Sequence, residues 1–227
     1  MTTPFQNKPL LGKGIYTLPD IAMILGIKYS KVNRWINCFW NDRFGQVYGE
    51  TYTWNVDLTK AVNFHTLVEL NTFYQLSLAG VSSREILKVH ELLAKQFNTP
   101  YPFARKDVIC HLHTDGKKVL FEQKDGSIYT LDVTKQFNLA IVKDFFKNLD
   151  FSSDSLASRL WPLGKTKAIV CDPHHQFGQP IISGTNILAE VIADMVESGD
   201  SVKFISNLYG LKVGQINDAL EYARKAA

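Results

Sequence analysis

The chain has 227 residues, of which 45% are hydrophobic and 21% are charged, as in ordinary folded proteins. Its three cysteines lie far apart without a C-x-x-C pair, so neither a disulfide framework nor a zinc ribbon is indicated. The first residues lack an apolar signal core, and there is no apolar run of about 18 residues. We therefore expect a cytoplasmic protein that has no membrane span.

Charge is distributed unevenly along the chain. Residues 1–60 hold seven basic and four acidic side chains, whereas residues 171–227 hold four basic and seven acidic ones. A basic front and an acidic back are typical of a head that binds nucleic acid and a tail that binds protein. Chance fluctuation in short windows explains the same charge counts, so the choice between the two interpretations depends on the motifs.

Residues 15–36 have the pattern of two short helices around a glycine turn. Thr17 is a good N-cap, Asp20 favours the helix N-terminus through its charge, and Gly26 ends the first helix. The apolar positions have helical spacing and are Ile21, Ile24 and Leu25, then Val32, Trp35 and Ile36. Two such helices form a helix-turn-helix.

The polar face of the second helix indicates DNA binding, because Arg and Asn read guanine and adenine edges while Lys suits phosphates. Residues 43–49 contain two glycines and predict a β-hairpin that reaches the phosphate backbone. The expected DNA-binding residues are Lys28, Tyr29, Ser30, Lys31, Asn33, Arg34, Arg43 and Gln46. The alternative interpretation is a solvated polar face on an αα-hairpin.

Two longer helices are expected next, one at residues 57–78 and one at residues 82–97 that begins with a Ser82 and Glu85 capping box. The order of strand, capped helix, Leu-Gly turn, basic helix, hairpin and helix resembles the MerR-like winged-helix domain over residues 15–97. The resemblance implies a winged helix-turn-helix that binds double-stranded DNA.

The middle of the chain predicts a three-stranded antiparallel β-meander and then a short helix at residues 137–149. The meander is expected from three apolar runs, at 108–113, 119–121 and 128–131, and from Asp-Gly turns at 115–116 and 125–126. No Gly-rich phosphate loop or nucleophile motif is present in the sequence. We expect no enzyme activity, no cofactor and no metal site.

The segment from Asp172 to Thr185 is dense in prolines and glycines, and Ile181 with Ile182 predicts a very short strand. It also contains His174 and His175, which we expect to be exposed or capping histidines. A catalytic domain that uses one of them is the third interpretation of the chain.

Three short helices are expected after this segment, the first two ending at Gly199 and Gly210 and the second capped by Ser201. Their apolar positions are Leu188, Val191, Ile192, Met195 and Val196, then Val202, Ile205 and Leu208, then Ile216, Leu220 and Ala223. About 40 residues of helix bury little apolar surface alone, so we expect an interaction module that needs a partner.

The motifs of this back segment are Asp172-Pro173, Phe177-Gly178-Gln179-Pro180, Gly184-Thr185, Glu197-Ser198-Gly199-Asp200-Ser201 and Leu208-Tyr209-Gly210-Leu211. Over residues 168–225 the chain is similar to the domain of unknown function four-three-three, a trihelical domain found in VapB-type antitoxins. The layout of winged helix-turn-helix, β-meander and trihelical domain resembles the longer VapB-like antitoxins.

This resemblance implies an antitoxin that binds a PIN-type ribonuclease toxin and represses its own operon by binding promoter DNA. The partner-binding residues expected are Phe177, Pro180, Ile182, Thr185 and Asn186. A homodimer is expected because such readers usually bind two-fold symmetric operators. The main alternative is a ligand-responsive MerR-like transcriptional regulator whose sensor is the β-meander.

The sequence thus predicts an α+β protein, mainly α, in three parts. Residues 1–99 are expected to form the winged helix-turn-helix DNA-binding domain. Residues 100–167 are expected to form the β-meander and a helix connector, and residues 168–227 the trihelical antitoxin-type domain.

Overall fold

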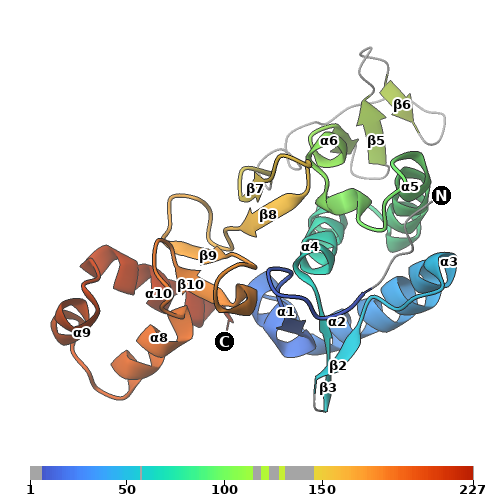
Figure 1. The fold of residues 1–227 in the computed structure, drawn as a ribbon. Coiled ribbons are helices and arrows are strands. Elements are labelled where there is room, and N and C mark those ends of the chain that lie inside the picture. Colours follow the sequence, from blue (N-terminus) through green and yellow to red (C-terminus); the bar gives the residue numbers. More distant parts are fainter. Residues whose placement is uncertain (1–6, 57, 115–118, 123–127, 131–145, 227) are drawn as a thin grey trace. The chain divides into compact units, whose positions relative to one another are not determined.

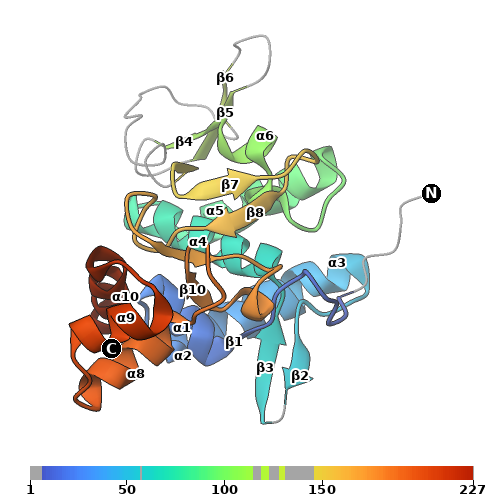
Figure 2. The ribbon, with the colours of Figure 1, turned by 60° about the vertical axis from the view of Figure 1, so that its left-hand side comes forward.

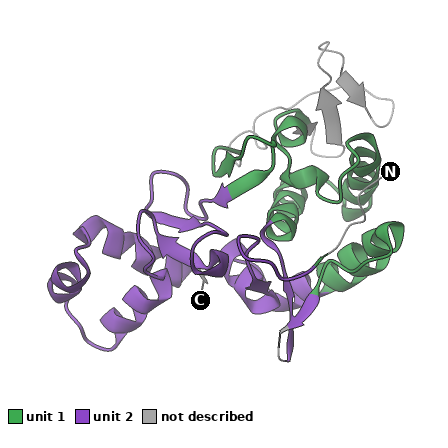
Figure 3. Cartoon of the chain, viewed as in Figure 1, with its two compact units in different colours: residues 1–7, 34–53, 65–158 green, residues 8–33, 54–64, 159–227 purple. Residues whose placement is uncertain are grey.

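The computed structural model describes residues 7–56, 58–114, 119–122, 128–130 and 146–226. Over these residues the protein is a mixed α+β structure, mainly helical, with small antiparallel sheets (Figure 1). It contains two compact units, each built from segments far apart in the sequence (Figure 3). Unit 1 comprises residues 1–7, 34–53 and 65–158, and unit 2 comprises residues 8–33, 54–64 and 159–227.

The first part of unit 2 is a small sheet with two helices. Its elements are β1 (Tyr16–Thr17), α1 (Leu18–Leu25), α2 (Tyr29–Trp35, whose last two residues belong to unit 1), β2 (Trp54–Val56) and β3 (Thr59–Val62). The strand order is β1-β3-β2, with both pairings antiparallel (Figure 2). Thr17 and Asp20 form the capping box of α1, and Gly26 ends the helix at a φ of 64°. The predicted start and end of this helix are confirmed.

The second part of unit 2 is a β-hairpin followed by three helices. Its elements are β9 (Ile169–Cys171), η3 (Gln176–Gly178), β10 (Pro180–Ile182), α8 (Ala189–Glu197), α9 (Val202–Tyr209) and α10 (Val213–Ala226). The short strand and the three helices are confirmed, as are the caps of α9 at Ser201 and Gly210. The helices and strands share one aliphatic core that includes Ile182, Ile205 and Ile216.

Unit 1 is built around two longer helices, α4 (Phe64–Leu78) and α5 (Ser83–Gln96), the second capped by Ser82 as predicted. Its other elements are η1 (Ile36–Gly45), α3 (Gln46–Tyr48), η2 (Pro102–Ala104), α6 (Lys106–Ile109), β4 (Leu112–Thr114), β5 (Val119–Glu122), β6 (Ile128–Thr130) and β7 (Leu149–Phe151). Strand β8 (Ala157–Leu160) runs from unit 1 into unit 2. The core of unit 1 is aromatic, with the rings of Trp35 and Trp40 each packed against Phe73.

The β-hairpin predicted at residues 43–49 is wrong. The chain leaves α2 as a π-helix, η1, and then continues as α3. Ile36, Trp40 and Phe44 are buried while the positions halfway between them are exposed, a pattern that a strand with its period of two does not give and a helix does. Gly45 has a helical φ of −57°, and a side chain there would lie 2.7 Å from the backbone oxygen of Glu50. This glycine therefore allows a close approach and makes no hairpin turn.

A hairpin does form later, where β2 and β3 pair with Trp54 opposite Ala61. The helix predicted at residues 57–78 therefore begins only at Phe64, because residues 59–62 pair with two neighbouring strands. The extended residues in this stretch gain hydrogen bonds on both sides, which a helix there would lose.

The β-meander is confirmed in part. β4, β5 and β6 pair antiparallel in that order, but residues 106–109 form helix α6, so the first strand starts later than predicted. Val108 and Ile109 are both fully buried, which a one-sided strand does not allow. The turns predicted at 115–116 and 125–126 lie outside the described residues. So does most of the helix predicted at 137–149, whose last residue instead begins β7.

Candidate DNA-binding and partner-binding surfaces

Helix α2 presents the predicted DNA-binding residues on its outer face. Val32, Trp35 and the following Ile36 are at most 1% exposed and fix the inner face of the helix. The outer residues are Lys28, Tyr29, Ser30 and Arg34, which are exposed, and Lys31 and Asn33, which are half-buried. The helix therefore carries cationic and amide side chains on its outer face.

Arg43 and Gln46 lie beyond α2, in η1 and α3 of unit 1. The Arg43 Nε donates to Glu91 Oε1 at 2.5 Å, and this bond raises the pKa of Arg43 and lowers that of Glu91. Gln46 is exposed. Because its charge is already paired within unit 1, Arg43 is a weaker candidate for phosphate contact than the residues of α2.

The β2–β3 hairpin is a surface element that occupies part of the stretch predicted to be helical from residue 57. It is joined to β1 through β3 and follows α1 and α2 in the chain. Asn55 is exposed, Lys60 is half-buried, and the side chain of Leu58, between the two strands, is fully exposed. The signal in the sequence is a pair of short strand-like runs, Trp54 to Val56 and Thr59 to Val62, on either side of a two-residue turn.

The segment from Asp172 to Thr185, here called the joint, is fixed by polar contacts. Asp172 is 4% exposed and accepts a bond from the Arg159 Nε at 2.7 Å and from the His174 backbone N–H at 3.0 Å. Gln176 and Phe177 adopt left-handed φ values of 46° and 54°, which cost about 1–3 kcal/mol each for residues other than glycine. The surrounding bonds hold this strained turn in place.

The joint is bonded to β1 within unit 2. The Tyr16 hydroxyl donates to the Gly178 backbone oxygen at 2.8 Å, and the Ile15 N–H donates to the Phe177 oxygen at 2.7 Å. Burial raises the pKa of Tyr16 well above its usual value, so the hydroxyl stays a donor. A side chain at Gly178 would lie 2.1 Å from the Tyr16 hydroxyl oxygen. The glycine is therefore required for this contact.

Two polar pockets in unit 2 share His175 and Asn186 in their walls. One has a volume of about 390 Å³ and also contains Arg159 and Asp172, and the other has about 550 Å³ and also contains Phe177. The Nδ1 atom of His175 lies 2.8 Å from Asn186 Oδ1, while its Nε2 lies 4.0 Å from Asp172. Within the described part of the chain, no group of three His, Cys, Asp or Glu residues is arranged to hold a metal ion.

The residues predicted to bind a partner differ in accessibility. Phe177 is 59% exposed, and Asn186 is exposed in the wall of both pockets. Thr185 is half-buried and donates to the Ile182 oxygen at 2.7 Å, Pro180 is half-buried in β10, and Ile182 is fully buried in the core. The structure therefore brings Phe177 and Asn186 to one surface and gives Ile182 a place in the interior.

The three-helix module, residues 189–226, exposes large apolar side chains. Leu208 and Val191, which the helical pattern assigns to the interior, are 56% and 37% exposed. The helix spacing was right, but three short helices cannot enclose every apolar position. The exposed apolar residues of the module are Val191, Phe204, Leu208, Tyr209 and Val213. Such exposure on a small module marks a candidate interaction surface.

A model of the family described as "Protein of unknown function (DUF433)" matches residues 169–223. The chain thus contains a DUF433 segment that extends from β9 into α10. None of the helices in the described residues is both long and apolar enough to cross a membrane.

Two curated proteins of Mycobacterium tuberculosis are similar to the chain. "Uncharacterized protein Rv2308" is 24% identical over 226 residues, which cover 95% of this chain and 92% of that protein. "Putative antitoxin VapB45" is 27% identical over 166 residues, which cover 67% of this chain and 66% of that protein. These are distant relatives.

A solved structure has the same fold. The X-ray crystal structure of Rv2018 from Mycobacterium tuberculosis matches with a TM-score of 0.69 at 17% sequence identity. The match covers 95% of this chain and 99% of that one, so the likeness extends over both units.

Proposed function

We propose that the protein is a VapB-like antitoxin that captures a toxin protein and represses its own operon by binding DNA. The observation that carries this proposal is the exposed apolar surface on a DUF433 module, in a chain that is 27% identical to "Putative antitoxin VapB45". The PIN-type ribonuclease identity of the toxin rests on the resemblance to VapB-type antitoxins. On this proposal the chain is not itself an enzyme and acts as a homodimer in the cytoplasm.

The DNA-binding half of the proposal rests on the order β1-α1-α2-β2-β3 in unit 2. This order supports a winged helix-turn-helix whose recognition helix is α2 and whose wing is the β2–β3 hairpin. Lys28, just before α2, and Arg34, on α2, are exposed and suit phosphate contact and base readout respectively.

The partner-binding half rests on α9 and the joint. Phe204 and Leu208 are one helical turn apart and more than half exposed, which gives α9 an apolar stripe. Asn186 and Phe177 add a polar and an aromatic contact beside the pockets. A partner protein that covers these side chains removes apolar surface from water, the main driving force of association.

Co-expression with the protein encoded by an adjacent PIN-type reading frame tests the proposal. The full-length chain should copurify with that protein and restore growth. The double variant Phe204→Asp with Leu208→Asp should do neither, whereas Lys203→Asp, an exposed change on the same helix, should behave as wild type. If the double variant still copurifies with the toxin and restores growth, α9 is not the toxin-binding surface. If the wild type does neither, the proposed function is wrong.

The DNA-binding half has its own test. The wild-type protein should bind the DNA upstream of its operon in a mobility-shift assay, with affinity that falls steeply as salt rises. Equal affinity for unrelated DNA of the same length would contradict operator recognition.

A further inference from the structure

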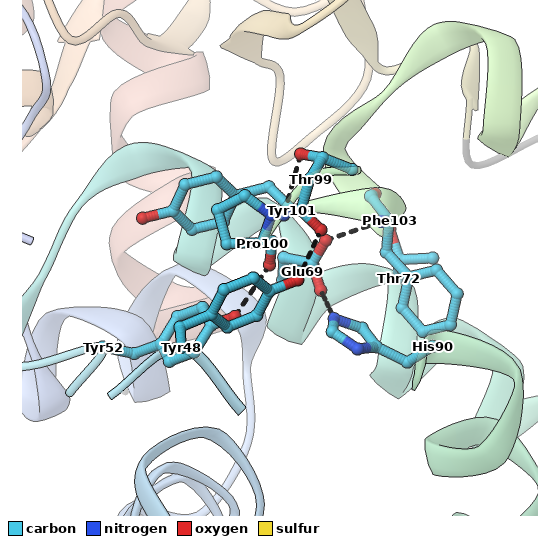
Figure 4. Close-up of polar contacts among 9 residues, drawn as sticks. All are labelled: Tyr48, Tyr52, Glu69, Thr72, His90, Thr99, Pro100, Tyr101 and Phe103. Atoms are coloured by element: carbon cyan, nitrogen blue, oxygen red, sulfur yellow. Dashed lines mark hydrogen bonds and ion pairs between the residues drawn. The ribbon is translucent and has the colours of Figure 1, made fainter. Parts of the chain in front are cut away.

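Among the described residues, two carboxyl groups are buried, Glu69 in unit 1 and Asp172 in unit 2. Glu69 is enclosed in the interior, because its Oε1 accepts the Phe103 N–H, its Oε2 faces His90 Nε2, and both partners are buried (Figure 4). Asp172 differs, since it bonds to a side chain at the surface, that of Arg159, which is 50% exposed. A buried carboxylate is costly unless it is paired, so Asp172 holds this exposed cation in a defined position.

The bond to Asp172 leaves one edge of the Arg159 guanidinium without a partner. The Arg159 Nε donates to Asp172 Oδ2 at 2.7 Å, while Asp172 Oδ1 accepts the His174 backbone N–H at 3.0 Å. In the described part of the chain, neither Nη1 nor Nη2 of Arg159 has a hydrogen-bond partner. This edge presents two N–H groups side by side, which a planar carboxylate matches with two parallel bonds.

Arg159 and Asp172 lie in the wall of the 390 Å³ pocket described above, and all residues of that wall belong to unit 2. Trp161, Val170 and Ile181 contribute aromatic and aliphatic side chains to the same wall. The volume is near the lower end of the range for small-molecule sites, about 300–1,000 Å³. The pocket therefore combines an unpaired cationic edge with apolar surface, in a space that suits a small ligand.

The Asn186 amide adds a further donor to this wall. Its Oδ1 lies 2.8 Å from His175 Nδ1, and because an amide oxygen can only accept, the imidazole donates. This bond orients the amide, whose Nδ2 group has no hydrogen-bond partner among the residues that the structure describes. Arg159 and Asn186 both offer unpaired N–H groups, so the pocket suits a ligand that accepts hydrogen bonds.

We propose that this pocket binds a small carboxylic acid with a flat apolar body. The carboxylate accepts from the Nη1 and Nη2 edge of Arg159, in a pocket whose wall also carries the Asn186 donor, and the body lies against the apolar residues. A carboxylate is favoured over a phosphate because Asp172 already balances the charge of Arg159, so each further negative charge on the ligand is repelled. The proposal goes beyond the proposed function, and it is tested on the chain alone, without DNA or toxin.

Calorimetric titration of the full-length protein with 2-naphthoate, 2-naphthamide and 2-naphthyl phosphate tests the proposal. The probes share one ring system and differ in the polar group. 2-Naphthoate should bind at least ~10-fold more tightly than the uncharged amide, and more tightly than the phosphate, which brings a second negative charge towards Asp172. Any other order of affinities, or no binding of 2-naphthoate at millimolar concentration, would overturn the proposal.

Arg159→Gln tests the cationic edge, because it removes the charge and keeps an N–H donor for Asp172. 2-Naphthoate should then lose its advantage over 2-naphthamide, while the affinity for the amide stays close to that of the wild type. Arg105→Gln is the matched control, since the Arg105 Nε of unit 1 also donates to an Asp side chain, that of Asp107, at 2.9 Å, and Arg105 lies outside the pocket. An advantage for the acid that survives Arg159→Gln would contradict the proposal.

Asn186→Asp tests the same wall from a second side. The change keeps an oxygen that faces His175 Nδ1 and places a negative charge in the pocket. 2-Naphthoate should bind at least ~10-fold more weakly, and 2-naphthamide as before. Asn217→Asp, at an exposed position on α10, is the matched control and should bind both probes like the wild type. Equal losses in the two variants, or no loss in Asn186→Asp, would place the probe elsewhere and refute the proposal, even if Arg159→Gln fails to fold.

Discussion

The two units of the molecule use their large apolar side chains in opposite ways. In unit 1, Trp40 and Phe44 are at most 2% exposed and pack around a buried Glu and His pair. In the three-helix module of unit 2, the core is aliphatic around Ile205, while Phe204 and Leu208 are 51% and 56% exposed. Unit 1 therefore encloses the large rings of Trp40 and Phe44, whereas the module leaves Phe204 and Leu208 outside its own core.

The largest expected effect comes from the interior of unit 1. Trp40→Ala removes a fully buried ring that contacts Phe44 and Phe73, and should lower the free energy of unfolding by about 3–5 kcal/mol. Phe204→Ala is the matched change in the module and should cost about 0.5 kcal/mol or less. Urea unfolding of both variants measures the contrast, and equal losses would contradict the comparison.

The next largest effect concerns the joint in unit 2. Gly178→Ala combines a left-handed φ of 89° with a clash against Tyr16, whereas Gly184→Ala has a similar φ of 80° and open space around it. Both should cost about 1–2 kcal/mol for the backbone conformation. Gly178→Ala should cost about 1–3 kcal/mol more, because the clash is against a buried ring. Thermal unfolding of the pair isolates this difference; similar losses would refute the role given to Tyr16.

A smaller effect is expected for DNA binding by α2. Arg34→Ala should cost about 1–3 kcal/mol on the operator and relax base preference, because the proposed function assigns this exposed Arg to base readout. Lys31→Ala should weaken binding to all sequences alike. Mobility shifts with the operator and with a scrambled duplex separate the two, and identical behaviour of Arg34→Ala and wild type would contradict the assignment of α2.

The smallest effect is a pH dependence that belongs to unit 1. The pKa of Glu69 is raised in the folded protein, so the folded state binds its proton more tightly than the unfolded state does. Its contribution to stability is complete below the ordinary pKa of Glu, about 4.3, and is lost as pH rises through the folded value. The stability of wild type relative to Glu69→Gln should therefore fall from pH 4 towards neutrality, as urea titrations can measure. A difference that rises with pH would contradict this sign.

Local patterns in the sequence predict much of unit 2. Thr17, Gly26, Ser201 and Gly210 act on their own helix ends, and each is found in the predicted role. Such caps depend on a few neighbouring residues, so a single sequence is enough to identify them.

The elements that a single sequence did not predict depend on distant contacts. Gly45 looks like a turn residue, yet it is helical, because the burial of Trp40 and Phe44 continues the helix through it. His90 and Glu69 lie on two different helices, 21 residues apart in the chain, and the residues around each give no sign that the two side chains are in contact. The hydrogen bond between Tyr16 and Gly178 in the joint is equally hard to predict, because the two residues are 162 positions apart.

The account depends most on the claim that a toxin protein covers the exposed face of α9. The direct measurement is the affinity of the adjacent PIN-type protein for wild type, Phe204→Ala and Lys203→Ala, with the unfolding free energy of each variant measured in parallel. Phe204→Ala should weaken binding by about 2 kcal/mol, roughly 30-fold, with stability unchanged to within about 0.5 kcal/mol. Wild-type affinity in Phe204→Ala would contradict the claim that this face is reserved for a partner.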